Sequence, residues 1–244
     1  MKIVAVIPAR YNSTRFPGKP LADICGKPMI WWVYNQVKKV KEINEVYVAT
    51  DDERIEKVCT DYNFNVVMTS VDNETSTTRV QEVSTKVKAD LYLVINGDEP
   101  LIDPNVIRKI IPHEEINNND IYVANLMTKI TDPVQMLDFT NIKVVTDVNN
   151  NAMFFSRSPI PYPKNSLDYS FYKHVGVLIY NKKALDFFKN TKKGKIEMIE
   201  DVNEIRFIEN GAKIKMVEVE SESLSVDTPK DLIKIRELIN EKEN

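Results

Sequence analysis

Short apolar segments alternate with amphipathic ones between residues 2 and 111, and this alternation constrains the fold more than any other feature of the sequence. Four segments have the length and residue types of buried strands: Lys2–Ile7, Glu45–Thr50, Asn65–Met68 and Leu91–Ile95. The segments that follow them have helical spacing or a helix-start signal: Met29–Val40, the residues after Asp51-Asp52, Thr77–Val87 and Pro104–Ile111. Because strands that alternate with helices form mostly parallel sheets, the sequence predicts an α/β fold.

The pattern changes between residues 120 and 180. Four strand-like segments follow one another there with no long helix among them: Asp120–Met127, Ile142–Asp147, Ala152–Phe155 and His174–Tyr180. We expect an excursion from the main sheet, either a small antiparallel lobe or a dimerisation arm. Helical spacing returns at Lys195–Ile208 and Pro229–Glu241, and no linker separates independent domains. Residues 1–244 are therefore predicted to form one domain, with the lobe at about residues 120–180.

Composition excludes several classes of protein. The net charge is −3, so no overall field favours nucleic acid or an anionic membrane, and we expect neither as a partner. No apolar run approaches the ~20 residues that cross a bilayer, and the apolar N-terminus meets Pro8 and Arg10 too early for a signal peptide. Cys25 and Cys59 form no disulfide framework or metal-ligand pattern, which fits a reducing compartment. The sequence therefore predicts a cytoplasmic protein.

The loop IPARYNSTRFPGKPL follows the first predicted strand and carries groups that suit a triphosphate. Arg10, Arg15 and Lys19 supply cations, and Ser13 supplies a hydroxyl donor. Open α/β sheets bind ligands at the carboxyl ends of their strands, where this loop begins. The loop lacks the glycine spacing of a Walker loop and of a dinucleotide fingerprint. A solvated basic loop is the alternative interpretation, but the rigid prolines around the cations favour a binding loop.

Two aspartates are candidate magnesium ligands. Asp98, in NGDEP, directly follows an apolar strand, so its carboxylate is expected at the same edge of the sheet as the phosphate loop. Asp227, in SVDTPKDL, is the candidate second carboxylate, although an aspartate before Thr-Pro is also a good helix N-cap. Carboxylate oxygens are the ligands that Mg²⁺ prefers, and a triphosphate needs Mg²⁺ to neutralise the departing pyrophosphate.

Further polar residues are candidates for an acceptor pocket. Arg157 lies between an apolar strand and a proline turn, where a guanidinium can bind a carboxylate at two points. His174 precedes an apolar strand, and Glu197 and Glu200 lie one helical turn apart. Taken alone, His174 is better explained as a structural histidine, and the two glutamates are better explained as a solvated helix face.

Several motifs together resemble one family. The segment IPARYNSTRFPGKPLADICGKPM resembles the signature loop of the CMP-Kdo synthetases, the 3-deoxy-manno-octulosonate (Kdo) cytidylyltransferases. NGDEP, VDTPKDL, FSRSPIPY and KHVGV are also similar to motifs of that family, and the similarity extends over nearly the whole chain. The resemblance implies a Rossmann-like α/β fold with a dimerisation lobe, and a homodimer. It also implies transfer of CMP from CTP to an acidic sugar with release of pyrophosphate, for lipopolysaccharide or capsule synthesis.

The same resemblance implies roles for individual residues. Asp98 and Asp227 would bind the catalytic magnesium, and together with Arg10 and Lys19 they would form the catalytic set. Arg157, His174, Glu197 and Glu200 would meet the acceptor, and Arg206 would follow the acidic residues of their helix. The nucleotide would be bound by residues from three segments: Pro8, Ala9, Arg10, Ser13, Arg15, Lys19, Thr77, Arg79 and Asn96.

The chain departs from the family pattern mainly around the expected acceptor. A glycine and an acidic residue of the family are Ser76 and Thr78 here, a glutamine is Asn96, an arginine is Lys173, and a third acidic residue is Asn203. We therefore expect CTP chemistry with Kdo, an amino-substituted Kdo, another carboxylated sugar, or a small phosphate or phosphonate as acceptor. A different nucleotide, a nucleotide-sugar glycosyltransferase and a non-catalytic nucleotide-binding protein are the remaining alternatives.

Overall fold

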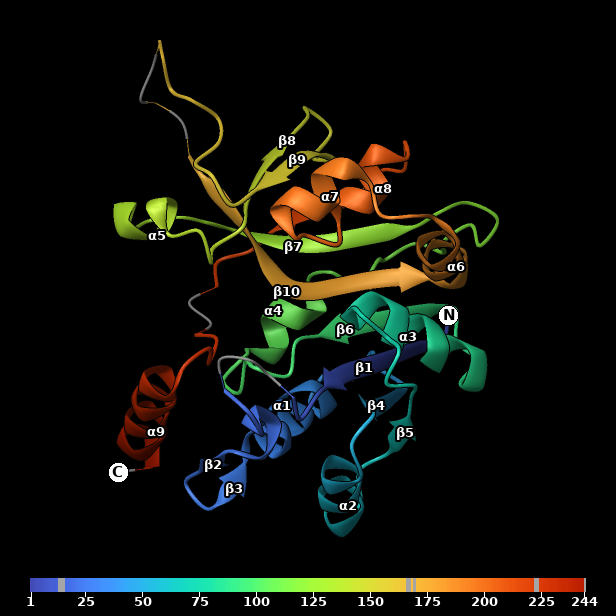
Figure 1. The fold of residues 1–244 in the computed structure, drawn as a ribbon, viewed down its shortest axis with the longest axis vertical. Coiled ribbons are helices and arrows are strands. Elements are labelled where there is room, and N and C mark those ends of the chain that lie inside the picture. Colours follow the sequence, from blue (N-terminus) through green and yellow to red (C-terminus); the bar gives the residue numbers. More distant parts are fainter. Residues whose placement is uncertain (13–15, 166–167, 169, 222–223, 244) are drawn as a thin grey trace.

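The computed structural model describes residues 1–12, 16–165, 168, 170–221 and 224–243. It contains one large central sheet with helices on both sides (Figure 1). Ser13 and Arg15, two of the predicted phosphate-binding residues, lie outside the described residues.

Seven strands form the continuous path of the central sheet. In their order across it they are β11 (Lys215–Glu218), β7 (Val123–Lys129), β10 (Tyr172–Asn181), β6 (Leu91–Ile95), β1 (Ile3–Ala9), β4 (Glu45–Thr50) and β5 (Val66–Met68). β1 pairs in parallel with both β4 and β6, whereas β10 runs antiparallel to β6 and β7. The prediction of a mostly parallel α/β sheet is therefore confirmed.

A small antiparallel extension leaves this sheet at β10. The start of β10 pairs with β8 (Lys143–Thr146), and β8 pairs with β9 (Ala152–Ser156). The short helix α5 (Pro133–Leu137) lies beside these strands, at the upper left of Figure 1. This extension is the antiparallel lobe that the change of pattern after residue 120 predicts, but β7 and β10, two of the four segments expected to leave the main sheet, belong to its central path.

Helices cover both faces of the sheet because the strands alternate their side chains between two cores. In β1, Ile3, Ala5 and Ile7 pack into one core, and Val4 and Val6 pack into the other. The first core is completed by α1 (Met29–Lys38), α2 (Glu53–Asp61) and α4 (Pro104–Arg108). The second is completed by α3 (Ser76–Lys86), α6 (Lys182–Asn190) and α8 (Ile205–Glu209).

Polar side chains fix the starts of three helices. The Asp52 carboxylate accepts a hydrogen bond from the Arg54 N–H and caps α2, as the sequence predicts. Thr75 and Thr78 form a reciprocal capping box at α3, and Asn181 caps α6. Because Thr75 sits at the cap, the start of α3 is held at a defined place beside the sheet edge.

The last helix, α9 (Pro229–Glu243), returns to the N-terminal half of the chain. It packs on a third apolar cluster beside the small hairpin of β2 (Asp23–Ile24) and β3 (Lys27–Pro28), where Ile24 and Met29 meet Leu232 and Ile235. Figure 1 shows α9 next to this hairpin, below the carboxyl end of β1. The docking of α9 brings the segment just before it, including Asp227, to the edge of the sheet.

Several elements differ from the sequence-based expectation. The helix predicted at Lys195–Ile208 is two short helices, α7 (Lys195–Glu200) and α8, because Asp201 adopts a left-handed conformation with φ 52° and ends the first of them. Helices α5 and α6 and strands β2, β3 and β11 are not among the elements predicted from the sequence.

None of the helices in the described part of the chain combines the length and apolar character needed to cross a membrane.

Candidate active site

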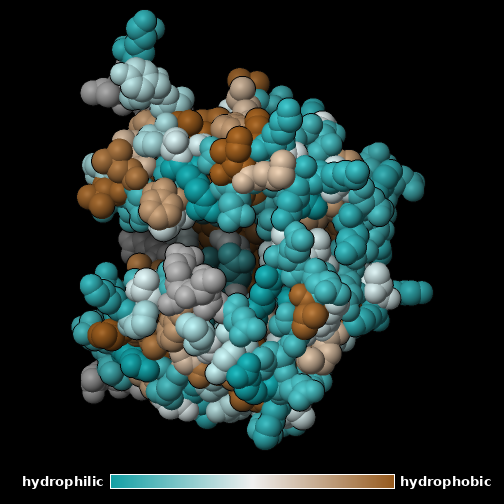
Figure 2. Space-filling view, viewed as in Figure 1, coloured by the Kyte–Doolittle hydropathy of each residue, from teal (hydrophilic) through white to brown (hydrophobic). Residues whose placement is uncertain are grey.

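The candidate site lies at the carboxyl ends of β1 and β6. β1 lies between β4 and β6 in the sheet. The chain leaves the carboxyl end of β1 toward β4 and leaves the carboxyl end of β6 toward the other side of the sheet, so the two connections diverge and a crevice opens between them. Figure 2 shows this face of the molecule hollowed between the part that carries α5 and the part that carries α9, with hydrophilic side chains on the walls.

The position of Lys19 follows from the local fold of the loop after β1. Gly18 adopts φ 70°, which a residue with a side chain rarely adopts, and its N–H donates to the Tyr11 carbonyl at 2.7 Å. A short 3-10 helix, Lys19–Leu21, begins directly after it, with Pro20 buried inside. The turn therefore points the Lys19 side chain back toward the sheet edge.

The Lys19 ammonium joins the two predicted metal aspartates. Its Nζ lies 2.9 Å from Asp98 Oδ2 and 3.7 Å from Asp227 Oδ1, and it also donates to the Val226 carbonyl at 2.9 Å. The Val226 N–H donates in turn to the Asp98 carbonyl at 2.8 Å. Residues that are more than 200 positions apart in the sequence, Lys19 and Asp227, thus converge on one point with Asp98.

The backbone before α9 is held independently of the Asp227 side chain. The N–H groups of Asp227 and Thr228 donate to Asp231 Oδ2 at 3.1 and 2.8 Å. The Asp231 carboxylate therefore caps the start of α9, and helix capping does not explain why an aspartate stands at position 227.

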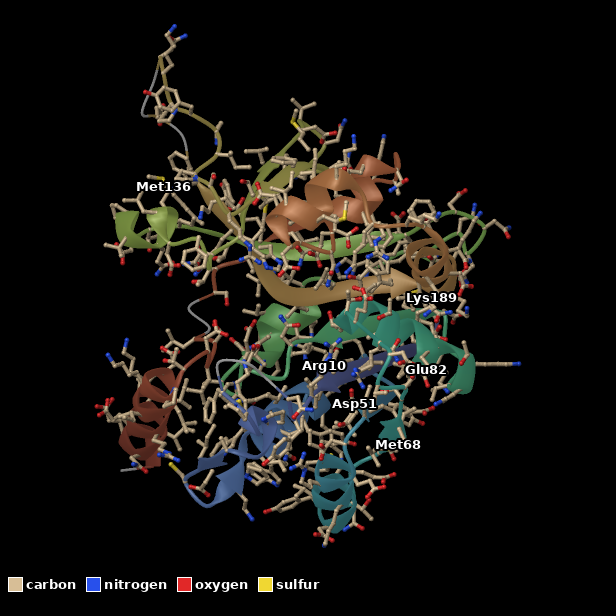
Figure 3. The ribbon with its side chains drawn as sticks, viewed as in Figure 1. Arg10, Asp51, Met68, Glu82, Met136 and Lys189 are labelled. Carbon is tan, nitrogen blue, oxygen red and sulfur yellow. The ribbon has the colours of Figure 1, made fainter. Side chains whose placement is uncertain are left out.

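Arg10 is held at the end of β1 by the loop that precedes α3. Its Nη2 donates to the Asn73 carbonyl at 2.6 Å. Burial, and then the positive charge of Arg79, lower the pKa of Arg10, whereas Asp51 acts in the opposite direction. Figure 3 shows Arg10 and Asp51 close together beside the end of β1. A partly desolvated guanidinium next to a second arginine is a favourable partner for phosphate oxygens.

Arg79 itself is fully buried. Its guanidinium forms an ion pair with Asp51 at 2.7 Å and a hydrogen bond with the Thr69 hydroxyl. Thr77 is also buried, with 2% of its surface exposed, and forms a hydrogen bond with Tyr180. Thr77 and Arg79, both predicted to bind the nucleotide, thus lie behind the site, where they support α3 and Arg10.

A cavity of about 540 Å³ opens beside Arg10 and Asp98. Its walls come from the ends of β1 and β6, the start of α3 and the α7 region: Pro8, Arg10, Glu74, Thr75, Ser76, Asn96, Gly97, Asp98, Lys193, Glu197, Met198, Asp201 and Asn203. Lys193 Nζ and Glu74 Oε2 form an ion pair of 2.7 Å on the wall.

A second, smaller cavity of about 170 Å³ lies on the β10 side of the same aspartates. It shares Asn96 and Asp98 with the larger cavity, and Asp227, Lys173 and His174 also line it. Burial, and then the positive charges of Arg157 and Lys173, lower the pKa of His174 to about 4, so its imidazole is neutral at physiological pH.

Gly176 allows β10 to approach the loop after β6. A Cβ at this position would lie 2.3 Å from Asn96 Nδ2 and 2.9 Å from Glu99 Oε1, closer than atoms can pack. The Asn96 N–H donates to the Gly176 carbonyl at 2.9 Å and holds the two segments together. The position of Asn96, which lines both cavities, therefore depends on a glycine in the neighbouring strand.

The two glutamates of α7 bind different protein partners. Glu197 forms a buried two-point ion pair with Arg206, with Nη2–Oε1 2.6 Å and Nε–Oε2 2.8 Å. Glu200 accepts hydrogen bonds from the Ser156 hydroxyl at 2.7 Å and the Arg157 N–H at 2.8 Å. Glu197 still borders the larger cavity, whereas Glu200 fastens β9 to α7.

Arg157 does not line either of the two cavities. Its guanidinium donates to the carbonyls of Glu200 at 2.6 Å, Phe139 at 3.1 Å and Asp201 at 3.0 Å. This side chain braces the antiparallel lobe against α7, so the geometry gives no support to the predicted contact between Arg157 and an acceptor carboxylate.

The structure thus brings together most, but not all, of the predicted site residues. Those that line at least one of the two cavities or contact the aspartates are Pro8, Arg10, Lys19, Asn96, Asp98, Asp227, His174 and Glu197. Ala9 is buried at the end of β1, and Thr77, Arg79, Arg157 and Glu200 support the site from behind.

Several cavity residues were not predicted from the sequence. Glu74 and Thr75 directly precede Ser76, and the capping signal of α3 could have drawn attention to Thr75. Lys193 belongs to the lysine-rich run KKGK before α7, which could have indicated a basic wall. Asp201 shows no comparable signal, because its place in the cavity depends on the break between α7 and α8.

The sequence matches known proteins along almost its entire length. Residues 4–214 match the model of the family described as "Cytidylyltransferase". The chain is 42% identical over 235 residues to the 8-amino-3,8-dideoxy-manno-octulosonate cytidylyltransferase of Shewanella halifaxensis, covering 95% of this chain and 96% of the relative. It is also 42% identical over 249 residues to the 3-deoxy-manno-octulosonate cytidylyltransferase of Geobacter sulfurreducens, covering 97% and 99%.

Solved structures give the same picture of the fold. A CMP:2-keto-3-deoxy-manno-octonic acid synthetase solved with CTP superposes with a TM-score of 0.90 at 38% identity, covering 99% of this chain and 100% of the other. The inositol-1-phosphate CTP transferase of T. maritima superposes with a TM-score of 0.71 at 16% identity, covering 99% and 96%, which shows a shared fold.

Proposed function

The chain belongs to the cytidylyltransferase family, and on that premise we propose that it transfers CMP from CTP to Kdo or its 8-amino analogue and releases pyrophosphate. The observation that carries the proposal is the convergence of Lys19, from the phosphate loop, with Asp98 and Asp227 at the carboxyl ends of β1 and β6. Relatives that act on each of the two sugars are equally similar to the chain, so both acceptors belong to the proposal.

The donor set at this point fits Mg²⁺. Two carboxylates already lie on either side of one cationic group, the Lys19 ammonium. No group of three or more histidines, cysteines or carboxylates is gathered within the described residues, and Mg²⁺ does not need one, because it binds through one or two carboxylates together with substrate phosphates. When bound between Asp98 and Asp227, the dication would neutralise charge on the triphosphate and on the departing pyrophosphate.

The reaction needs positioning rather than a covalent intermediate. A hydroxyl oxygen of the acceptor, the anomeric hydroxyl in Kdo, attacks the α-phosphorus and forms a new P–O bond. The bond between that phosphorus and the oxygen that bridges to the β-phosphate breaks, pyrophosphate leaves, and the hydroxyl proton passes to solvent. Arg10 and Lys19 would hold the phosphate oxygens and the two aspartates would hold the metal ion, so catalysis depends on orientation and electrostatics.

We also propose that the protein is a homodimer that uses the antiparallel lobe. Apolar side chains on and after α5 are exposed: Val134 by 72%, Leu137 by 72% and Phe139 by 68%. Figure 2 shows hydrophobic side chains gathered over α5. Such a patch supports an interface with a second copy, because monomers rarely expose clustered large apolar residues.

The proposed setting is the cytoplasm, where CTP is available, and the proposed product would supply lipopolysaccharide or capsule synthesis. Cys25 and Cys59 are both unpaired thiols, one exposed and one buried, which suits a reducing compartment.

The decisive experiment measures pyrophosphate release from the purified protein with Mg²⁺. CTP, UTP and ATP are each combined with Kdo, 8-amino-Kdo and a panel of small phosphates and phosphonates. Release that requires both CTP and an eight-carbon acid is the expected result. Release only with another nucleotide or with a phosphate acceptor would replace the proposal, and no release with any pair would reject an enzymatic role.

A further inference from the structure

The turn at residues 70–73, between β5 and α3, presents a backbone carbonyl to Arg10. The Asn73 carbonyl accepts a hydrogen bond from Arg10 Nη2 at 2.6 Å, and Asn73 is itself buried, with 5% of its surface exposed. Arg10 lines the larger cavity, so this carbonyl helps to set where the guanidinium lies in its wall. A guanidinium is planar and its N–H groups have fixed directions, so a shift of one acceptor turns the whole group.

The charges around Arg10 make this acceptor important. Burial, and then the positive charge of Arg79, lower the pKa of Arg10, so the two guanidiniums repel each other. The Asp51 carboxylate acts in the opposite direction, but it also forms the ion pair with Arg79 at 2.7 Å. Arg10 is therefore held beside a like charge, and the Asn73 carbonyl is one of the contacts that keep it there.

Glu82, in the middle of α3, holds this turn in place. Its Oε2 accepts hydrogen bonds from Asn73 Nδ2 at 2.6 Å and from the Ser70 N–H at 2.9 Å. Asn73 Nδ2 also donates to the Ser70 carbonyl at 3.1 Å. One carboxylate oxygen thus joins the first and last residues of the turn and fastens both to α3. Figure 3 shows Glu82 to the right of Arg10 and Asp51.

The other oxygen of Glu82 has a different partner. Its Oε1 forms an ion pair with Lys86 Nζ at 2.8 Å, one helical turn away, and the two side chains are 24% and 46% exposed. A pair of this kind on a helix surface contributes little to stability because water and salt screen it. The two bonds of Oε2 are charge-assisted and one of them reaches a buried residue, so they are the stronger contacts. The two roles of the carboxylate can therefore be separated by mutation.

We propose that Glu82 is a positioning residue that aims the Arg10 guanidinium at the phosphates of CTP through the turn at residues 70–73. The inference rests on the proposed function, in which Arg10 holds phosphate oxygens. Without the Glu82 carboxylate, Ser70 and Asn73 lose their shared acceptor, the Asn73 carbonyl moves, and Arg10 turns away from the phosphates. Glu82 lines neither cavity, so its removal should weaken the binding of CTP and leave the binding of the acceptor unchanged.

The test measures the Kd for CTP with Mg²⁺ by calorimetry, and the KM values for CTP and for the acceptor that supports pyrophosphate release. Glu82→Ala, which keeps a good helix former in α3, should raise the Kd and KM for CTP about fivefold or more, with the KM for the acceptor within about twofold of wild type. Glu82→Gln keeps an oxygen that can accept both bonds of the turn, so its Kd for CTP should stay within about threefold of wild type. Lys86→Met removes only the partner of Oε1 and is the matched control, which should bind CTP as the wild type does.

An Arg10→Met background separates positioning from a general structural effect. If Glu82 acts through Arg10, adding Glu82→Ala to Arg10→Met should change the Kd for CTP by less than about twofold. Additive losses, or a Kd for CTP that Glu82→Ala leaves unchanged, would overturn the proposal. Equal losses in Glu82→Ala and Lys86→Met would also overturn it, because the surface ion pair would then be responsible. A wild type that binds CTP but releases no pyrophosphate with any acceptor would reject the proposed function, and the Kd values would still decide the role of Glu82.

Discussion

At the scale of single residues, the site depends on one ammonium and two carboxylates that come from distant parts of the chain. We predict that Asp98→Asn lowers kcat/KM for pyrophosphate release by about three orders of magnitude, because an amide oxygen is a far weaker ligand and counter-charge for Mg²⁺ than a carboxylate. The ion pair with Lys19 is partly exposed, so the melting temperature should change little. Steady-state kinetics and a thermal melt measure both quantities.

Asp61→Asn is the matched control for this change. Asp61 ends α2, and its exposed side chain forms a surface ion pair with Lys57. It should leave turnover and melting unchanged. Full activity of Asp98→Asn with Mg²⁺ would remove this carboxylate from the metal site.

Residue types and spacing indicated Asp98 and the phosphate loop, because those residues directly follow strands and their side chains must emerge at the sheet edge. Asp227 precedes a helix instead, and the family resemblance implied its role. The same signals could not predict the partners of Arg79 and Arg157. Both arginines lie in segments that suit ligand binding. In the structure, however, Arg79 is buried and paired with Asp51, and Arg157 donates hydrogen bonds to three backbone carbonyls. An arginine can bind a backbone carbonyl or a ligand equally well, and only the three-dimensional fold decides between them.

At the scale of elements, the close contact between β10 and the loop after β6 controls the position of Asn96. We predict that Gly176→Ala lowers kcat/KM about tenfold or more while costing only about 1 kcal/mol of stability, because the added Cβ displaces chiefly the Asn96 side chain, and to a smaller extent the end of the Glu99 side chain, rather than backbone. Kinetics and urea unfolding measure the two effects. Asn96→Ala and the double variant complete the comparison: the double variant should be no worse than Asn96→Ala alone, and additive losses would contradict this explanation.

The break between α7 and α8 places Glu204 in a buried position next to Glu197. Burial, and then the negative charge of Glu197, raise the pKa of Glu204 to about 7. The folded state therefore holds this proton more tightly than the unfolded state, so the stability that it contributes is complete below about pH 4.5 and is lost as the pH rises through about 7. We predict that Glu204→Gln matches the wild type at pH 5 and exceeds it by roughly 2–3 kcal/mol at pH 8.

Urea unfolding at the two pH values measures this difference. Glu237→Gln, an exposed change on α9, should shift neither value. Parallel pH profiles for wild type and Glu204→Gln would show that the Glu204 carboxyl keeps its ordinary pKa in the folded protein.

Two strands of the parallel half of the sheet were predicted most accurately. The bounds predicted for β4 and β6 are those observed, because both are short β-rich runs between polar turns. Strand β11 begins with Lys215 and ends with Glu218, so its pattern does not differ from that of a loop, and its pairing with β7 is decided by the tertiary structure. The single helix expected at Lys195–Ile208 has continuous helical spacing, but residues 201–204, which begin with the left-handed Asp201, interrupt it.

At the scale of the whole molecule, the sequence predicted the parallel half of the sheet and an antiparallel lobe, but not how the two enclose a site. β10 runs through the centre of the sheet and contributes at one end to the lobe and at the other to the core. Helix α9 closes the opposite side through its contact with the β2–β3 hairpin. The two aspartates meet only because both of these long-range contacts form, and no local pattern encodes them.

The lobe is also where the whole-molecule prediction can be tested. We predict that the wild type has twice the mass of one chain in solution and that Leu137→Glu converts it to a monomer, because a charge in the middle of a buried apolar patch cannot be solvated. Light scattering after size-exclusion chromatography measures the mass. Val71→Glu is the matched control: Val71 is 75% exposed in the loop after β5, away from the lobe, so this variant should stay dimeric. A monomeric wild type, or a Leu137→Glu variant that remains a dimer, would show that the exposed side chains of α5 do not form the interface.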